Sequence, residues 1–243
     1  MNNALRNVYL SLDLIKFKVD RFLSSRERNK GSLSDQKTIP KIIHYAWFGG
    51  GGMSALCHEC MATWSKVMPD WKIMLWNEDN FPMEKFPYVE DAIKRKCWAY
   101  VSDVARLYAV HQYGGVYMDT DVEVLRPFDD LLMLPFFTCY EAPTQVTMST
   151  FGSVRGHPCL GMLLEWYKTI RLRRAYIDVA NVRFVSKLVR SEYGVKLDGK
   201  ELHLKDGSVI FPREYFSPKP LGNGRWGITE NTYSVHRFNA CWY

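Results

Sequence analysis

The sequence predicts an α/β fold with a mainly parallel sheet and helices on both faces, preceded by an N-terminal amphipathic helix. Two observations indicate this class. Short apolar segments alternate along the chain with segments of helical periodicity, an order that favours parallel pairing. Residues 116–118, Val-Tyr-Met, are too short and apolar to be anything but a buried strand. Ligands of such sheets bind beyond the carboxyl ends of the strands, so functional residues are expected there.

Residues 1–30 are predicted to form an amphipathic helical arm. Apolar residues recur there at steps of three and four, and the other face is basic. The apolar positions are Leu5, Val8, Leu12, Ile15, Val19 and Phe22, and the basic ones are Arg6, Lys16, Lys18 and Arg21. This pattern fits a membrane contact, packing on the domain or a short coiled coil. The polar residues 31–38 are predicted to be a linker.

Residues 39–243 are expected to form one folded domain, and no internal repeat is visible in them. A strand (41–47) and a glycine turn (49–52) precede a helix (54–67), a strand (71–76), helices (88–113) and the strand at 116–118. The remainder is predicted as strand 136–140, helices 159–174 and 179–193, and short strands 209–211 and 233–236.

Two aspartates, Asp119 and Asp121, follow the buried strand. Because side chains alternate along a strand, both are expected on one side of the extended chain, opposite Thr120. Paired carboxylates at a strand end suit a hard divalent cation, which prefers oxygen ligands and keeps substrate phosphates in its shell. An isolated Asp-x-Asp is also common in turns and helix caps, so the pair alone leaves both interpretations open.

Asp103 and Arg106 lie three residues apart on the preceding predicted helix, where they can act together. The alternative is an ion pair on the helix surface that contributes little to stability. The combination Ser-Asp-x-x-Arg and Gly-Gly-x-Tyr-x-Asp-x-Asp, with residues 107–113 between the two halves, is far more restrictive than either half.

This combination, within residues 102–121, resembles the sugar-binding region of family-32 glycosyltransferases. Residues 39–49 (IPKIIHYAWFG) are similar to that family's opening strand, and residues 64–76 to its second helix-strand unit. Residues 229–242 are similar to its closing motif of His followed by Ser-Trp, although Cys241 stands where the family has Ser. The resemblance implies a GT-A fold with a Rossmann-like nucleotide-binding unit, and Mn²⁺ or Mg²⁺ as the cofactor.

The resemblance also implies roles for residues of the donor site. Tyr45, Ala46 and Trp47 would contact the nucleotide, with the Trp47 ring stacked on the base. Asp103 and Arg106 would act in catalysis by holding the donor sugar and its phosphate region. A tryptophan at the position of Trp47 is as often a core residue, which is the alternative.

Further implied roles concern the metal. Asp121 would be a direct metal ligand and catalytic residue, Asp119 would reach the ribose or the metal, and His236 would be a third ligand. Trp242 would cover the diphosphate, or else be an apolar plug, and His236 could be a core residue instead. Glu141, expected after its strand, is a polar group near the reaction but is not favoured as a nucleophile.

The implied activity is that of a hexosyltransferase that retains the anomeric configuration. A UDP-sugar donor is favoured, because residues 45–47 are similar to the uracil-stacking segment of the family's distant toxin relatives. The expected acceptor is a lipid-diphosphate-linked oligosaccharide of bacterial surface polysaccharide, such as capsule or O-antigen. Two alternatives stay open: a nucleotide-sugar hydrolase or phosphotransferase with the same metal site, and a noncatalytic module that docks on membranes or nucleic acid.

Composition and charge bound the setting. The net charge of +6 fits an anionic membrane face or a diphosphate-linked substrate better than nucleic acid, because no basic stripe with interleaved aromatic residues occurs. Neither a spanning segment nor a signal peptide is apparent, and the 6 cysteines are unevenly placed. These observations predict a cytoplasmic protein, peripheral on the inner face of the cytoplasmic membrane. Cys57 and Cys60 have the spacing of half a zinc site, but no second pair accompanies them.

Overall fold

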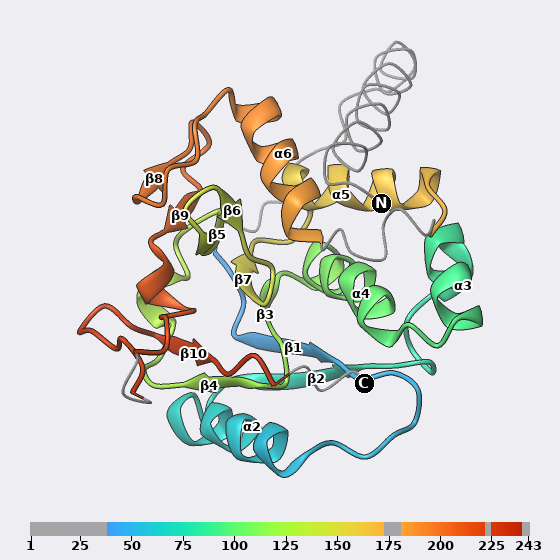
Figure 1. The fold of residues 1–243 in the computed structure, drawn as a ribbon, viewed down its shortest axis with the longest axis horizontal. Helices are drawn as coiled ribbons and strands as arrows, with labels where there is room; N and C mark the ends of the chain where they lie inside the picture. Colours follow the sequence, from blue (N-terminus) through green and yellow to red (C-terminus); the bar gives the residue numbers. More distant parts are fainter. Residues whose placement is uncertain (1–37, 173–180, 222–224, 240–243) are drawn as a thin grey trace.

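The computed structural model describes residues 38–172, 181–221 and 225–239. The predicted arm, the linker up to residue 37, Cys241 and Trp242 lie outside the described residues. One sheet of eight strands forms the centre of the structure (Figure 1). Its order is β2 (Lys72–Trp76), β1 (Ile42–Ala46), β3 (Gly115–Met118), β7 (Thr150–Ser153), β5 (Phe136–Ala142), β9 (Val209–Phe211) and β8 (Leu202–His203), with β6 (Gln145–Val146) beside β5.

Most strands of this sheet run in the same direction. Strand β1 pairs parallel with β2 and β3, and β5 pairs parallel with β9. Strand β7 pairs antiparallel with both β3 and β5, so these two neighbours of β7 also share one direction. The predicted α/β class with a mainly parallel sheet is therefore confirmed. Strand β7 was not predicted from the sequence. Its Gly152 passes so close to the Phe137 ring that a Cβ atom would lie 2.3 Å from it.

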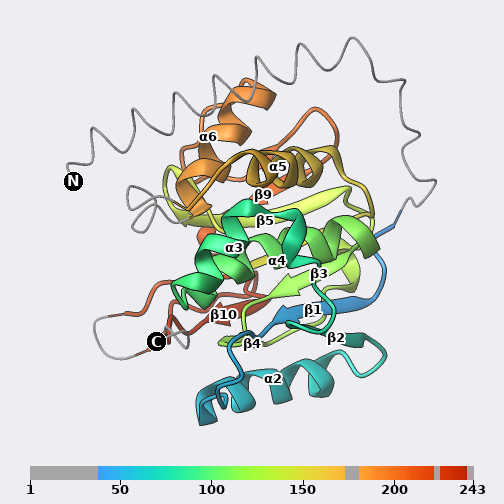
Figure 2. The same ribbon diagram turned by 90° about the vertical axis from the view of Figure 1, so that its right-hand side faces the viewer.

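Helices pack on both faces of the sheet (Figure 2). Helix α2 (Ala55–Val67) lies on one side, and α3 (Pro87–Lys94), α4 (Trp98–Tyr113), α5 (Pro158–Thr169) and α6 (Asn181–Tyr193) lie on the other. The alternation of side chains along β3 matches these two layers. Val116 and Met118 pack in the hydrophobic cluster that contains Trp64 of α2, whereas Tyr117 packs in the cluster formed with α4.

A two-stranded antiparallel sheet brings the C-terminal region to the centre of the molecule. Strand β10 (Ser234–His236) pairs with β4 (Val122–Val124), and His236 lies opposite Val122. The indole nitrogen of Trp64 donates a 2.7 Å hydrogen bond to the carbonyl oxygen of Val122, which fixes this small sheet against α2. Short 3₁₀ helices at Met83–Lys85, Asp129–Leu131 and Arg213–Tyr215 complete the described elements.

Helix boundaries differ from the sequence prediction where local backbone chemistry intervenes. The predicted helical stretch 88–113 is two helices, α3 and α4, with Lys96 between them at a φ of 56°. Helix α5 ends at Thr169 instead of residue 174, because Ile170 adopts extended backbone angles. Helix α2 begins where predicted, with the Ser54 hydroxyl accepting a hydrogen bond from the Cys57 amide. None of the described helices is long and apolar enough to cross a membrane.

Candidate active site

The Asp-x-Asp motif lies in a turn between β3 and β4. Strand β3 ends at Met118, so Asp119 and Asp121 belong to a turn and not, as predicted, to the extended strand. The amide of Asp119 donates to the carbonyl oxygen of Ser149 (2.8 Å), and the amide of Val122 donates to that of Asp119 (3.0 Å). Both side chains are buried, with exposed fractions of 8% for Asp119 and 6% for Asp121. The turn thus holds two carboxylates together away from bulk water.

Arg106 of α4 connects Asp103 with the motif. Its Nη2 lies 3.2 Å from a carboxylate oxygen of Asp103 and 3.2 Å from one of Asp119. Its Nη1 donates a 2.9 Å hydrogen bond to the carbonyl oxygen of Met148, and its Cζ lies 4.9 Å from the centroid of the Tyr117 ring. Arg106 is only 6% exposed. The alternative of a surface ion pair is therefore wrong, because the two side chains are only 7% and 13% exposed and Arg106 is shared with Asp119.

The electrostatics of the carboxylates differ. Burial raises the pKa of Asp119 in spite of the nearby Arg106. Burial also raises the pKa of Asp103, to about 6, against the opposing charge of Arg106. At Asp121 the effect of burial is outweighed by the hydrogen bond and charge of His236 and by the Asn239 amide, so its pKa is lowered. Asp121 is thus the carboxylate whose ionised form this environment favours.

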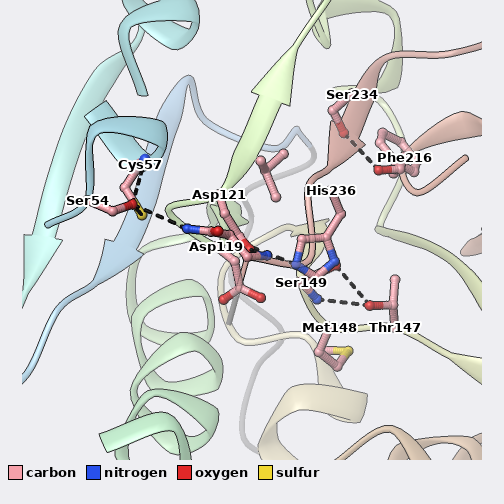
Figure 3. Close-up of polar contacts among 12 residues, drawn as sticks. Ser54, Cys57, Asp119, Asp121, Thr147, Met148, Ser149, Phe216, Ser234 and His236 are labelled. Carbon is pink, nitrogen blue, oxygen red and sulfur yellow. Dashed lines mark hydrogen bonds and ion pairs between the residues drawn. The ribbon is translucent and has the colours of Figure 1, made fainter. Parts of the chain in front are cut away.

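The C-terminal segment contacts Asp121, and Figure 3 shows His236 of this segment beside it. The Nε2 atom of His236 lies 3.3 Å from one carboxylate oxygen of Asp121, and the Asn239 amide donates a 2.8 Å hydrogen bond to the other. The Arg237 amide donates to the Asp121 carbonyl oxygen (2.9 Å). Between these two amides Phe238 has a φ of 51°, which is uncommon for an aromatic residue and costs about 1–3 kcal/mol. The two hydrogen bonds to Asp121 hold this conformation.

Asp119, Asp121 and His236 fit a divalent cation. One ligand atom from each lies within 4.8 Å of the others, and in the described part of the chain no other His, Cys, Asp or Glu residues form such a group. The Nδ1 atom of His236 is buried, with no hydrogen-bond partner in the described residues. Two ligand atoms that are each about 2.1 Å from an octahedral ion, at right angles to each other, lie about 3 Å apart. The Nε2 atom of His236 and a carboxylate oxygen of Asp121 are 3.3 Å apart, which is close to this value.

Burial lowers the pKa of His236, but the hydrogen bond and charge of Asp121, followed by the charges of Asp119 and Glu141, raise it overall. Glu141 lies on β5, which is two strands away from β3 in the sheet, and its charge acts on His236 from there. Cys57 and Cys60 are buried in α2 and belong to no metal-binding group in the part of the chain described here. The zinc alternative has no support in this geometry.

The predicted nucleotide-binding segment lies at the end of β1, next to β3 in the sheet. Ala46 is the last residue of β1 and is buried, while Tyr45 packs edge-on against Trp64 and is half-buried. Trp47 follows the strand, and its indole nitrogen donates a 2.6 Å hydrogen bond to the Gly51 carbonyl oxygen. The half-buried Trp47 ring is thus fixed at the carboxyl edge of the sheet, as the sequence predicts.

Several groups of the site were not predicted from the sequence. The Tyr117 hydroxyl donates a 3.0 Å hydrogen bond to Asp119, a contact that the Tyr-x-Asp spacing could have indicated. The carbonyl oxygens of Met148 and Ser149 hold Arg106 and the Asp119 amide. Backbone carbonyls leave no signal in a sequence, so these partners could not be predicted.

Comparison with known proteins agrees with this geometry. Residues 54–137 match the family model described as "Glycosyltransferase sugar-binding region containing DXD motif". Inositol phosphoceramide mannosyltransferase 3 of Schizosaccharomyces pombe is 27% identical over 172 residues, covering 62% of this chain and 44% of that protein. Mannosyl phosphorylinositol ceramide synthase SUR1 of Saccharomyces cerevisiae is 27% identical over 159 residues, covering 62% of this chain and 41% of that protein. The chain thus spans less than half the length of these yeast relatives.

Two further proteins match over most of their length. The uncharacterized glycosyltransferase L373 of Acanthamoeba polyphaga mimivirus is 28% identical over 200 residues, covering 74% of this chain and 76% of that protein. The solved structure of the PaToxG glycosyltransferase superposes with a TM-score of 0.55 at 14% identity, covering 79% of this chain and 81% of that one. The α/β fold is therefore that of GT-A glycosyltransferases. Within this fold, residues 54–137 are similar to the DXD-containing sugar-binding region of glycosyltransferases.

Proposed function

We propose that this protein is a metal-dependent hexosyltransferase that moves a sugar from a nucleotide sugar to an acceptor hydroxyl. The observation that carries the proposal is the convergence of Asp119, Asp121 and His236 beside the buried pair of Asp103 and Arg106. The DXD family match over residues 54–137 supports the same reaction class. Metal-binding carboxylates beside a buried cation suit a reaction in which a diphosphate departs.

The reaction breaks the bond between the anomeric carbon and a phosphate oxygen, and forms a bond from that carbon to the acceptor oxygen. The nucleoside diphosphate departs with the electron pair of the broken bond and takes up the proton of the acceptor hydroxyl. A divalent ion held by Asp119, Asp121 and His236 would stabilise the charge that develops on the leaving diphosphate. Arg106 fixes Asp103 and Asp119 through its guanidinium. In this proposal the two fixed carboxylates accept hydrogen bonds from donor hydroxyls, and the positive charge of Arg106 favours the departing anion.

We place the protein in glycosyltransferase family 32 and propose that it retains the anomeric configuration. The Ser-Asp-x-x-Arg and Gly-Gly-x-Tyr-x-Asp-x-Asp motifs support the family. Retention needs either a carboxylate nucleophile or an acceptor that attacks the anomeric carbon from the same face as the departing diphosphate. Glu141 is the partly buried carboxylate whose charge acts on His236. Loss of donor hydrolysis in Glu141→Gln would indicate a nucleophile, and retained hydrolysis would indicate a bystander. The anomer of the product formed by the wild-type protein, followed by NMR, tests retention.

The donor and acceptor follow from two separate arguments. Residues 45–47 favour a UDP-sugar, whereas the names of the yeast relatives favour mannose as the sugar that is transferred. The acceptor in this proposal is lipid-linked, as in the lipid-diphosphate oligosaccharides of capsule or O-antigen assembly or the inositol phosphoceramide in the relatives' names. A basic chain with a net charge of +6 suits either anionic acceptor.

A donor-hydrolysis screen tests the proposal without knowledge of the acceptor. The full chain is incubated with Mn²⁺ and a panel of UDP- and GDP-sugars, and release of the nucleoside diphosphate is measured. We expect hydrolysis of at least one donor, abolished by EDTA and by Asp121→Asn, and unchanged in Glu123→Gln. Absence of any hydrolysis or donor binding would overturn the proposal. A nucleotide-sugar hydrolase would be favoured instead if, at saturating donor, the final sugar product forms without any acceptor hydroxyl.

We further propose that the protein acts at the inner face of the cytoplasmic membrane, through the basic amphipathic arm of residues 1–30. An anionic leaflet attracts each cation with roughly 1 kcal/mol. In the full chain, replacing Lys16, Lys18 and Arg21 by Gln should release the protein from vesicles that contain phosphatidylserine. Unchanged vesicle binding would assign the arm to packing or pairing. Salt-sensitive vesicle binding in a protein without donor hydrolysis would instead indicate a noncatalytic docking module.

A further inference from the structure

Phe238 and Arg213 lie beside the metal-binding group, yet the reaction as proposed gives neither a role. The Phe238 ring centroid lies 4.0 Å from that of His236. The Cζ atom of Arg213 lies 5.7 Å from the Phe238 centroid. A series of contacts therefore runs from Asp121 through His236 and Phe238 to Arg213. Arg106 contacts Asp119, the other aspartate of the motif, and is not part of this series.

Phe238 holds an exposed aromatic ring in a fixed place. Phe238 is 42% exposed. The amides of its two neighbours, Arg237 and Asn239, are both bound to Asp121, which fixes the backbone of Phe238 at its positive φ. These backbone contacts need no aromatic side chain. A large apolar ring kept in water beside a metal-binding histidine is a surface on which a ligand can pack.

Arg213 differs from the comparable arginine elsewhere in the structure. Arg126 stacks on Tyr233 at 4.0 Å, and its terminal nitrogens bind the Glu230 carbonyl oxygen, Asp130 and the Tyr233 hydroxyl. Arg213 donates from Nε to the Ser217 carbonyl oxygen at 2.7 Å. Within the described residues, its terminal nitrogens have no hydrogen-bond or ion-pair partner. Arg213 can therefore bind an anion in a way that Arg126 cannot.

We propose that Phe238 and Arg213 form the acceptor subsite, and that the acceptor carries a phosphate next to the ring that is glycosylated. This assignment rests on the proposed transferase function. The exposed part of the Phe238 ring packs against the apolar face of a sugar or polyol ring. The terminal nitrogens of Arg213 bind the phosphate, whose oxygens match the planar fork of a guanidinium. The substrate class is thus a phosphorylated sugar or polyol head group.

Binding of glucose 6-phosphate and of glucose to the full chain tests this subsite. Saturation-transfer NMR is recorded with EDTA present, so that no metal ion binds the phosphate. We expect a signal from glucose 6-phosphate that is at least fivefold above that from glucose. Arg213→Gln and Phe238→Gly should each lower it at least fivefold, Phe238→Tyr should restore it, and Arg126→Gln should leave it unchanged. Glycine suits the positive φ of Phe238, so this variant removes the ring without new backbone strain.

Three results would each overturn the subsite assignment. They are equal binding of both ligands to the wild-type protein, no binding of either ligand, and wild-type signals in both Arg213→Gln and Phe238→Gly. Calorimetric Mn²⁺ binding and melting temperature are measured beside the NMR. If Phe238→Gly loses Mn²⁺ affinity as well, Phe238 positions the Asp121 turn and the subsite assignment is wrong. Failure of the wild-type protein to hydrolyse any nucleotide sugar would count against the transferase proposal, independently of the NMR result.

Discussion

The backbone amide of Asn239 donates a 2.8 Å hydrogen bond to the carboxylate of Asp121, although 118 residues separate them in sequence. The side chain of Asn239 also donates to the Ser54 hydroxyl, at 3.3 Å, which caps helix α2. Asn239 therefore joins three distant parts of the chain. The geometry of Asp121 depends on the C-terminal segment as much as on its own turn.

Gly115→Ala should strongly destabilise the fold. A Cβ atom on Gly115 would lie 2.6 Å from the Ile42 carbonyl oxygen, and its φ of 110° is unfavourable for alanine. We expect a loss of about 2–4 kcal/mol in the free energy of unfolding, measured with urea. Gly51→Ala is the matched control, because no atom lies within 4 Å of its added Cβ, and its effect should stay within about 0.5 kcal/mol. Equal stability of the two variants would contradict this account.

Gly115 is one of the features that could be predicted from the sequence. Gly114 and Gly115 mark the helix-to-strand junction, and apolar periodicity indicated α2, α6 and the parallel strands, because these signals are local. The approach of His236 to Asp121 was implied only by the resemblance of residues 229–242 to the closing motif of family-32 glycosyltransferases. Strand β7 was missed because its Thr-Phe-Gly-Ser segment becomes a strand only by pairing between β3 and β5.

Burial of the Asp103 and Arg106 pair was also beyond the sequence analysis, for a related reason. Helical spacing places the two side chains together, but what covers them depends on distant segments. Arg106 meets the Met148 carbonyl oxygen 42 residues further along the chain. Asp119 likewise takes its backbone partner from Ser149. Long-range backbone contacts of this kind follow from tertiary packing and leave no periodic pattern.

Stability should fall as the pH decreases from about 6.5 towards 4, because of His44. Burial lowers its pKa to about 4. Its Nδ1 accepts a hydrogen bond from the Trp76 indole (3.0 Å) and its Nε2 donates to the Gly114 carbonyl oxygen (2.8 Å), so the folded protein requires the neutral ring. The unfolded chain takes up the proton near pH 6.5, so protonation favours unfolding across this window. The contribution lost is about 3 kcal/mol.

Urea unfolding at pH 7, 5.5 and 4 measures this contribution of His44. In His44→Gln the side chain stays neutral at every pH, so the decrease in stability should be smaller than in the wild-type protein. The exposed His58 provides the matched control, and His58→Gln should follow the wild-type profile. A His44→Gln profile parallel to that of the wild type would show that other groups dominate the acid response.

Arg106→Ala should unfold the site as well as inactivate it. Removal of the guanidinium leaves Asp103 and Asp119 buried without their shared cation, a change that costs about 3–5 kcal/mol. Arg171 also pairs with two carboxylates, Glu90 and Asp91, but its side chain is 55% exposed. Arg171→Ala should therefore cost at most about 1 kcal/mol. Similar urea midpoints for the two variants would contradict the buried character of the Arg106 pair.

Asp121→Asn should abolish Mn²⁺ binding and donor hydrolysis while the fold is retained. The amide oxygen of the new side chain still accepts the hydrogen bond from Asn239, but the negative charge is lost. Mutation of a residue that only hydrogen-bonds a metal ligand raises the dissociation constant of the metal by ~10–100-fold. Because Asp121 would itself be a ligand, we expect a larger rise for Mn²⁺. Glu123, one strand step further, pairs with Arg237, so Glu123→Gln should keep Mn²⁺ affinity and lose at most about 1 kcal/mol of stability.

His236→Ala separates a metal ligand from a core histidine. If His236 is the third ligand, the variant should require more Mn²⁺ for half-maximal activity and bind Mn²⁺ more weakly in calorimetry. Its melting temperature should change little, because the Asn239 amide still holds Asp121 and β10 still pairs with β4. Asp119→Ala should be nearly as inactive as Asp121→Asn. An unchanged Mn²⁺ midpoint in His236→Ala, together with a large fall in melting temperature, would show that the imidazole ring serves packing and is not a metal ligand.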